Sequence, residues 1–318
     1  MAVSQETREE HLNIESITWG DLTWVNIEHP TRRETQYLAQ HYPFHPFDLD
    51  DCLSRKQRPK LDEYKDYLFF IFHFPVYNKI TRVSTHGQAS VFIGDKYLIT
   101  LHSGELRSLT RLFRDCQTNE EGRQVNFSYG SGYLLYRIMD RAVDSYFPVI
   151  DKIFSLAEDI EDVVFDERVE AAQEVAILRR DIITQRRIIF PMRTVLAELE
   201  NKLKRFTKTD MGVYYGDLMD HMNKICESLD ELREIIEVYK DADFVLGTDR
   251  VNHILRILTI MSTIVLPFVV ISGIYGMNVR LPGGLEQQGG FATFIISMAV
   301  TLLVSITMLF YFRHRRWI

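Results

Sequence analysis

Residues Ile257 to Met277 read ILTIMSTIVLPFVVISGIYGM and contain no charged side chain. A second uncharged run, FATFIISMAVTLLVSITMLFYF, covers Phe291 to Phe312 after a gap of 13 residues. Each run has about the 20 residues that an α-helix needs to cross a bilayer. Hydrocarbon offers no partners for backbone N–H and C=O groups, so the runs predict two membrane-spanning helices, at about 254–277 and 291–312. Two buried helices of a soluble core are the alternative, but such helices are usually shorter and have a polar face.

Basic residues flank both runs on the same side of the predicted membrane. The sequence RHRRWI follows the second run, and Arg250 and Arg256 stand at the start of the first. The connecting loop carries only one arginine and one glutamate. The excess of positive charge predicts a protein of the cell membrane with both chain ends in the cytoplasm and the loop outside.

The composition limits the function of the remaining residues. The mean hydropathy is only −0.12 despite the two runs, so the first ~250 residues are polar. The net charge is −7, from 44 acidic and 37 basic residues. This balance argues against nucleic acid as a partner and suits a protein that collects cations. Cys52, Cys116 and Cys226 lie far apart, which indicates neither a disulfide framework nor a zinc site.

Three regions follow from the patterning: a mixed α/β domain at 1–130, a long-helix stalk at 131–250 and a membrane region at 251–318. In the first, Thr31 is a predicted helix cap and Pro43 a helix stop. Gly94-Asp95-Lys96 predicts a hairpin turn. The expected strands are Thr23–Ile27, Leu68–Val76, Ala89–Ile93 and Tyr97–Leu101, and the expected helices include FDLDDCL and Ser103–Asp115.

From about Ser131 onward the pattern is helical. We expect a helix from Tyr133 to Phe165 that is kinked at Pro148, and a second from Val169 to Phe206 that is broken near Pro191. The segment around 158–174 is acidic and the one that follows it is basic. Either the two are solvated faces that pair in a helical hairpin, or the acidic one concentrates cations near a portal.

The clearest periodicity belongs to a heptad seam. Its members are Leu218, Met222, Ile225, Leu229, Leu232, Ile236 and Tyr239. One helix can run from about Tyr215 to Gly276, on the order of 90 Å. Such a helix cannot bury its seam alone, so it packs against the preceding helices or against copies of itself, which suggests a homo-oligomer.

No catalytic constellation is present in the sequence, and we do not expect an enzyme. His41 and His45 are separated by Pro43, which prevents a shared helix face. Asp48, Asp50 and Asp51 more naturally begin a helix than bind a metal. There is no GxSxG, P-loop or GxGxxG motif.

One stripe of the first predicted span combines apolar and hydroxyl side chains. Leu255, Leu266 and Val269 are candidates for apolar constrictions, and Thr259 and Ser262 for hydroxyl ligands. The alternative is that the small residues only permit close helix packing. The second span is more uniformly apolar and suits a lipid-facing role.

Tyr275-Gly276-Met277-Asn278 closes the first span and resembles the GMN signature of CorA-type divalent-cation transporters. Pro267 inside the preceding helix, the short loop, the second span and the basic tail fit that family. So do QRPKLDEYKDYLFF, IGDKYLITLH and ILRRDIITQRRIIFPMR, so the resemblance covers essentially the whole chain.

The resemblance implies an α+β cytoplasmic domain followed by long helices and two transmembrane helices, in a funnel-shaped homopentamer. The asparagine of the signature, here Asn278, would form a ring at the outer mouth, with Tyr275, Gly276 and Met277 beside it. Mg²⁺ dehydrates reluctantly, so neutral carbonyl oxygens can hold its water shell without stripping it. With Thr259 and Ser262 of the stripe, the residues matching pore positions are Asn252, Leu255, Leu258, Leu266, Val269 and Gly273.

The resemblance also places a regulatory Mg²⁺ site at Asp217, to which we add Asp220; its partner carboxylate is not identified. The family often has methionine near Leu266 and threonine near Val269, so the constrictions differ here. The loop departs too, because VRLPGGLE replaces the acidic Met-Pro-Glu-Leu segment of magnesium transporters. Mg²⁺, with Co²⁺ or Ni²⁺, is the expected cargo. The alternatives are proton-coupled zinc transport, as in the ZntB branch, and a non-conducting membrane-anchored scaffold.

Overall fold

The computed structural model describes residues 12–54, 57–165, 171–277 and 290–315. Two compact units divide the chain, Met1–Lys240 and Asp241–Ile318, with the boundary inside one long helix. The predicted division at 130 and 250 is a finer one and stays a prediction. In chain order the elements are β1 (Glu15–Trp19), β2 (Leu22–Glu28), α1 (Arg32–His41), α2 (Pro46–Leu53), β3 (Lys60–Glu63), β4 (Leu68–Asn78), β5 (Val83–Ile93), β6 (Tyr97–His102), α3 (Arg107–Thr118), α4 (Glu120–Phe127), α5 (Ser131–Asp144), α6 (Phe147–Phe165), α7 (Ala172–Leu203), the 3₁₀ turn η1 (Lys204–Phe206), α8 (Gly212–Tyr275) and α9 (Gly290–His314).

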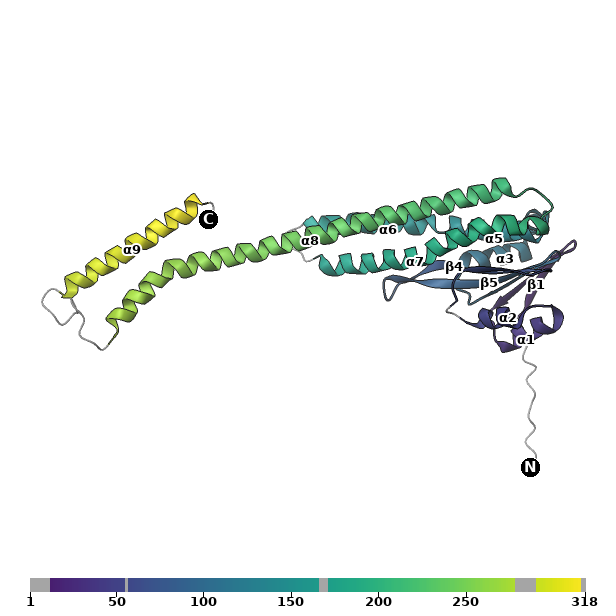
Figure 1. The fold of residues 1–318 in the computed structure, drawn as a ribbon, viewed down its shortest axis with the longest axis horizontal. Helices are drawn as coiled ribbons and strands as arrows, with labels where there is room; N and C mark the ends of the chain where they lie inside the picture. The colour runs from purple at the N-terminus through teal and green to yellow at the C-terminus, as the bar shows by residue number, and fades with distance from the viewer. Residues whose placement is uncertain (1–11, 55–56, 166–170, 278–289, 316–318) are drawn as a thin grey trace, which may run out of the picture. The chain divides into compact units, whose positions relative to one another are not determined.

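Strand β4 contributes side chains to two hydrophobic clusters, one on each face of the sheet. Successive side chains of a strand point to opposite faces, and β4 is apolar on both. The even-numbered residues from Leu68 to Phe74 join one buried cluster, whereas Phe69 and Ile71 join another. The strand order is β1-β2-β6-β5-β4-β3, and only β2 and β6 pair in parallel. Figure 1 shows α1 and α2 on one face of the sheet and α3, α5 and α7 on the other.

Several local predictions for the α/β region are confirmed. Thr31 caps α1 in a capping box, because its Oγ1 accepts from Arg33 N–H and its own N–H donates to Glu34 at 2.9 Å. The helix ends at His41, before Pro43. Strands β5 and β6 form the predicted antiparallel hairpin, and the segment FDLDDCL lies in α2. The predicted strands Thr23–Ile27 and Leu68–Val76 lie within β2 and β4.

Two helix boundaries differ from the predictions. Helix α3 begins at Arg107 rather than Ser103, because Gly104 has φ +75°, which a right-handed helix cannot accommodate. The expected kink at Pro148 is a break between α5 and α6, where the proline occupies the first turn of the new helix and its missing N–H costs nothing.

The break expected near Pro191 is absent, since α7 runs unbroken from Ala172 to Leu203. Proline removes one backbone hydrogen bond from the helix. The buried side chains of Ile189, Met192 and Leu196 on either side of it hold both halves in the main core cluster. Tertiary packing therefore overrides the local helix-breaking preference.

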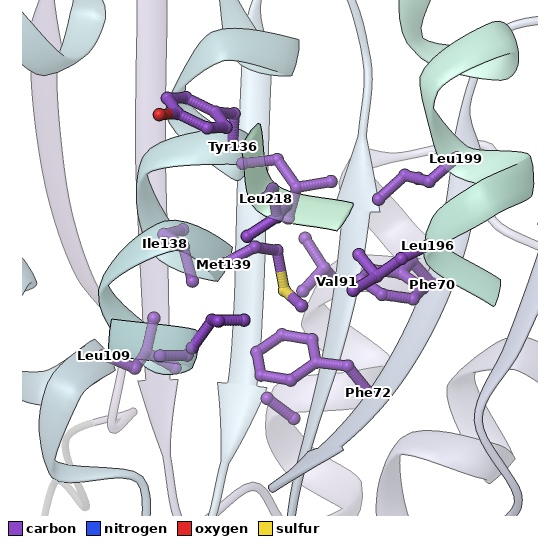
Figure 2. Packing of buried hydrophobic residues seen from close by; sticks show 14 of the residues in the cluster. Phe70, Phe72, Val91, Leu109, Tyr136, Ile138, Met139, Leu196, Leu199 and Leu218 are labelled. Carbon is purple, nitrogen blue, oxygen red and sulfur yellow. The ribbon is translucent and has the colours of Figure 1, made fainter. Parts of the chain in front are cut away.

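The heptad seam is buried by the chain itself. Leu218, Met222, Ile225 and Leu229 are fully buried in the main cluster, and Figure 2 shows Leu218 close to Met139 among the core side chains. The seam therefore needs no second copy, and the oligomer cannot be inferred from it. The basic segment also forms ion pairs with α8: Arg179 pairs with Glu237 at 2.7 Å, and Arg186 pairs with Asp230.

Candidate pore helix and acidic sites

Two helices of the described chain are long and apolar enough to cross a membrane. One is α8, whose 64 residues continue without interruption into the uncharged run, and the other is α9. The prediction of one continuous helix from about Tyr215 to the end of the first span is thereby confirmed. Asn278, the residue assigned to the outer ring, and the loop after it lie outside the described residues.

Within the second unit, α9 covers one face of α8. Ile260 is buried there, and the Ser305 hydroxyl donates to the carbonyl of Ile264 at 3.2 Å. Nearer the end of α8, the rings of Tyr275 and Phe294 meet edge to face at 5.5 Å. The two contacts fix an antiparallel pair. The Ser305 hydroxyl therefore serves the packing of α9 against α8.

The stripe predicted on α8 lies on the side that α9 leaves uncovered. Helical residues are spaced about 100° apart around the axis, which places the stripe about half a turn from Ile260 and Ile264. In the single chain Leu255, Leu266 and Val269 are 52%, 61% and 56% exposed. The remaining candidates, Asn252, Leu258, Thr259, Ser262 and Gly273, are exposed as well. The structure thus brings these residues to one accessible side of α8, with Leu258 and Val269 at its edges. Val269 also lines a cavity with Phe294, Met298 and Thr301 of α9.

Two threonine hydroxyls on this part of α8 donate their protons to the helix backbone. Thr259 Oγ1 bonds to the carbonyl of Leu255 at 2.8 Å, and Thr263 Oγ1 bonds to that of Thr259 at 2.7 Å. With its proton committed, the Thr259 oxygen presents lone pairs outward. Such an oxygen suits a cation or the water shell of one.

The outer end of α8 has its own geometry. Pro267 lies inside the helix without breaking it, and because it has no N–H the carbonyl of Thr263 lacks its helical partner. The helix closes at Tyr275, where Gly276 N–H still donates to Ser272 at 2.9 Å. A Cβ at Gly276 would lie 3.1 Å from that carbonyl, so a larger residue would press on the last turn. The helix therefore ends in a closely packed turn, which is formed by Tyr275, Gly276 and Met277.

The candidate regulatory carboxylates lie at the start of α8. Asp217 and Asp220 are exposed. Asp217 Oδ1 is 3.9 Å from His221 Nε2, whose Nδ1 is 3.4 Å from Asp144 Oδ1 on α5. Because Asp144 and Asp217 approach opposite nitrogens of the His221 ring, their two carboxylates are not placed to bind the same metal ion. No group of three or more His, Cys, Asp or Glu side chains among the described residues is arranged to hold a metal ion.

Sequence reasoning missed the α5 side of this cluster. Burial, followed by the charge of the neighbouring Asp144, raises the pKa of Asp140, while Arg137, paired with it at 3.1 Å, lowers it. Asp144 of α5 is more than seventy positions away from Asp217 and His221 of α8 along the chain, so only the fold brings the two groups together. A local signal existed in the i, i+4 spacing of Asp217 and His221.

The acidic cluster of α2 is occupied by internal partners. Asp48 accepts hydrogen bonds from the hydroxyls of Tyr64 and Tyr67, at 3.1 and 2.9 Å, and Asp51 pairs with Lys60 at 2.7 Å. Burial raises the pKa of Asp48, and the tyrosine hydroxyls counteract it. The interpretation of these aspartates as structural is supported by these contacts.

Comparison with known proteins identifies a family whose sequence profile matches most of the chain. The sequence profile of a family described as CorA-like Mg²⁺ transporter protein matches residues 19–315. The YfjQ protein of Bacillus subtilis (strain 168) is 31% identical over 310 residues, which span 96% of this chain and 94% of that protein. The cobalt/magnesium transport protein CorA of Thermotoga maritima is 26% identical and covers 93% and 83%.

Structural similarity agrees with the sequence match. The complete structure of the CorA magnesium transporter from Methanocaldococcus jannaschii superposes with a TM-score of 0.78 at 24% identity, over 95% of this chain and 94% of that one. The predicted fold class, an α/β part followed by long helices and two C-terminal apolar helices, is confirmed. A zinc transport protein, ZntB of Yersinia enterocolitica, is also similar, at 22% identity over 93% of this chain and 88% of that protein.

Proposed function

This chain belongs to the family of CorA-like Mg²⁺ transporter proteins, and we propose that it conducts Mg²⁺ through a central pore. Five copies assemble in the cell membrane, with both termini in the cytoplasm, and the stripe of α8 lines the pore. One observation carries the proposal: α9 covers the opposite side of α8 and leaves the stripe uncovered. Thr259, Ser262 and Gly273 gain little from contact with lipid, whereas they suit a water-filled path.

The outer filter is assigned to Asn278, with Tyr275, Gly276 and Met277 setting its position. Asparagine offers a neutral carbonyl oxygen, which can bind the water shell of Mg²⁺ and still release the ion. The close packing at Gly276, in the last turn of α8, supports a fixed position for the residues that follow the helix. Inward of the filter, Leu255, Leu266 and Val269 act as apolar constrictions that close by excluding water.

Gating by cytosolic Mg²⁺ is assigned to Asp217 and Asp220. Both are exposed on the first unit, where carboxylates of neighbouring copies can share an ion. At low internal Mg²⁺ such sites empty, the copies separate and the constrictions widen. The ion serves here as cargo and as regulator, and no organic cofactor is required.

A second candidate function is proton-coupled zinc transport. It is favoured by the similarity to ZntB and by the loop VRLPGGLE, which carries one arginine and one glutamate where magnesium transporters have an acidic segment. A loop of nearly zero charge attracts divalent cations less strongly. Co²⁺ and Ni²⁺ remain alternative cargoes beside Mg²⁺.

Dye-detected flux into proteoliposomes tests these assignments, with Mg²⁺, Co²⁺, Ni²⁺ and Zn²⁺ offered in turn. Asn278→Ala should abolish Mg²⁺ flux while the pentamer persists. Gln287→Ala, which removes another neutral amide of the same loop, should leave the flux unchanged. Zinc flux that follows a pH gradient would favour the ZntB-like function. A verified pentamer that conducts none of the four ions would favour a non-conducting scaffold.

A further inference from the structure

A cavity of about 530 Å³ lies in the first unit and is lined by none of the residues assigned to the stripe. Its walls come from the end of β4, the start of α3 and the junction of α5 and α6. This volume is within the range of small-molecule sites. We call it the basic cleft, after four cationic residues that line it: Lys79, Arg107, Arg111 and Arg141.

Most of these cations lack partners. Arg141 pairs with Asp115 at 2.9 Å. The side chains of Lys79, Arg107 and Arg111 are exposed and form no ion pair or side-chain hydrogen bond with the described residues. Three unpaired cations around one cleft, in a chain of net charge −7, raise the local concentration of anions.

The floor of the cleft is apolar and partly aromatic. Phe74 and Tyr146 are buried, and Val76 and Tyr77 are half-buried beside them. Gly87 lies behind this wall, where a Cβ would come within 2.8 Å of Val76 and 2.9 Å of Leu106. The bare glycine therefore lets the start of α3 pack closely against β4.

Two carboxylates, Glu105 and Asp144, also line the cleft. They disfavour a simple inorganic anion but can accept hydrogen bonds from hydroxyl groups. A suitable ligand therefore carries several negative charges, hydroxyl donors and a flat apolar body. Phosphate groups match arginine in geometry and charge. The half-buried ring of Tyr77 is the aromatic group of the floor that a nucleobase can stack on.

We propose that the basic cleft binds a nucleoside di- or triphosphate. Arg107, Arg111 and Lys79 hold the phosphates, the carboxylates hold ribose hydroxyls, and the base stacks on the ring of Tyr77. The cleft uses none of the residues assigned to the ion path, so its occupancy does not depend on whether the chain conducts Mg²⁺. Bound nucleotide would connect β4, α3 and α5, three elements of the unit that also carries Asp217.

Calorimetric titration of the full-length protein in detergent with ATP tests the proposal. Arg107→Ala and Arg111→Ala should each weaken binding by about tenfold, the usual loss for one charge-assisted hydrogen bond. Arg114→Ala is the matched control, because Arg114 is exposed on the same helix but does not line the cleft. It should leave the affinity unchanged.

Two comparison ligands sharpen the result. Adenosine, which lacks phosphates, and tripolyphosphate, which lacks the nucleoside, should each bind at least tenfold more weakly than ATP. The proposal is overturned if ATP does not bind at millimolar concentration, if Arg114→Ala costs as much as Arg107→Ala, or if tripolyphosphate binds as tightly as ATP. It also fails if Arg107→Ala changes the oligomer size in light scattering, since a second copy would then occupy the cleft.

Discussion

Along α8, the seam from Leu218 to Tyr239 and the stripe from Leu255 to Gly273 follow a similar three-and-four spacing. The seam is covered by the chain's own helices, and Leu229 and Leu232 are fully buried. The stripe stays open, with Leu266 61% exposed. An apolar repeat therefore indicates only that a face needs a partner. Which partner it finds depends on the elements around it.

The composition of the two repeats differs in a way that matches this difference. All members of the seam are large apolar residues or tyrosine, as the interior of a soluble unit requires. The stripe mixes leucine and valine with hydroxyl groups and a glycine. Seam and stripe should therefore respond to substitution in opposite ways: the seam in stability, and the stripe in transport.

The largest effect is expected from truncation of the seam. Leu229→Ala removes a fully buried side chain and should lower the free energy of unfolding of the first unit by about 2–5 kcal/mol. Urea denaturation followed by tryptophan fluorescence measures it, because Trp24 is buried in that unit. Leu255→Ala, the matched change on the stripe, should leave the transition unmoved. Equal destabilisation by both variants would contradict the comparison.

The sequence predicts well whatever depends on local pattern. The two apolar runs, the seam, the Thr31 cap and the β5–β6 hairpin are each encoded within a few turns or strands. Strands β1 and β3 escaped prediction because ESITW and KLDE are short, and only pairing with β2 and β4 makes them strands. The sheet order, with β2 parallel to β6, is likewise non-local.

The prolines and the acidic cluster depend on tertiary contacts, which a local stretch of sequence does not reveal. Pro148 begins a helix and Pro191 lies inside one, and the difference comes from packing that a window of sequence does not contain. For the candidate sites, helical spacing indicated the stripe, whereas Asp217 came only from the family resemblance. Neither could indicate that His221 lies between Asp217 and Asp144, since α5 and α8 meet only in the fold.

A change of the stripe should alter transport without altering stability. Leu266→Ala shortens a proposed apolar constriction, so water enters more readily and ion flux should rise several-fold. Val265→Ala is the control, because Val265 is similarly exposed, at 54%, but lies off the stripe. Proteoliposome flux and thermal melting are measured together. A rise in flux for both variants would show that the two faces of α8 are equivalent.

A smaller effect is expected from the hydroxyl of the stripe. Thr259→Val keeps the shape of the side chain and removes the oxygen, so flux should fall by a few-fold as the ion path loses one polar contact. Thr263→Val makes the same change one turn along, at a half-buried position off the stripe. The flux assay distinguishes the two. A greater loss in Thr263→Val would assign the path to another face.

The smallest effect on stability is expected from removal of an ion pair outside the seam. Hydrogen bonds from Lys240 and then Arg179 lower the pKa of Glu237 from 4.5 to about 2. A carboxylate with a lowered pKa in the folded protein stabilises it fully above its unfolded pKa, and this contribution is lost as the pH falls toward 2. Melting temperatures of the protein and of Glu237→Gln should therefore differ at pH 7 and converge between pH 4.5 and 2.

Glu231→Gln supplies the control, because Glu231 is exposed on α8 and has no ion pair among the described residues. Its melting temperature should follow that of the unaltered protein at every pH. The Glu237 difference should also shrink at high salt, since exposed pairs are screened. If Glu237→Gln destabilised the first unit as strongly as Leu229→Ala, charge pairing rather than the buried seam would hold α8 against α7.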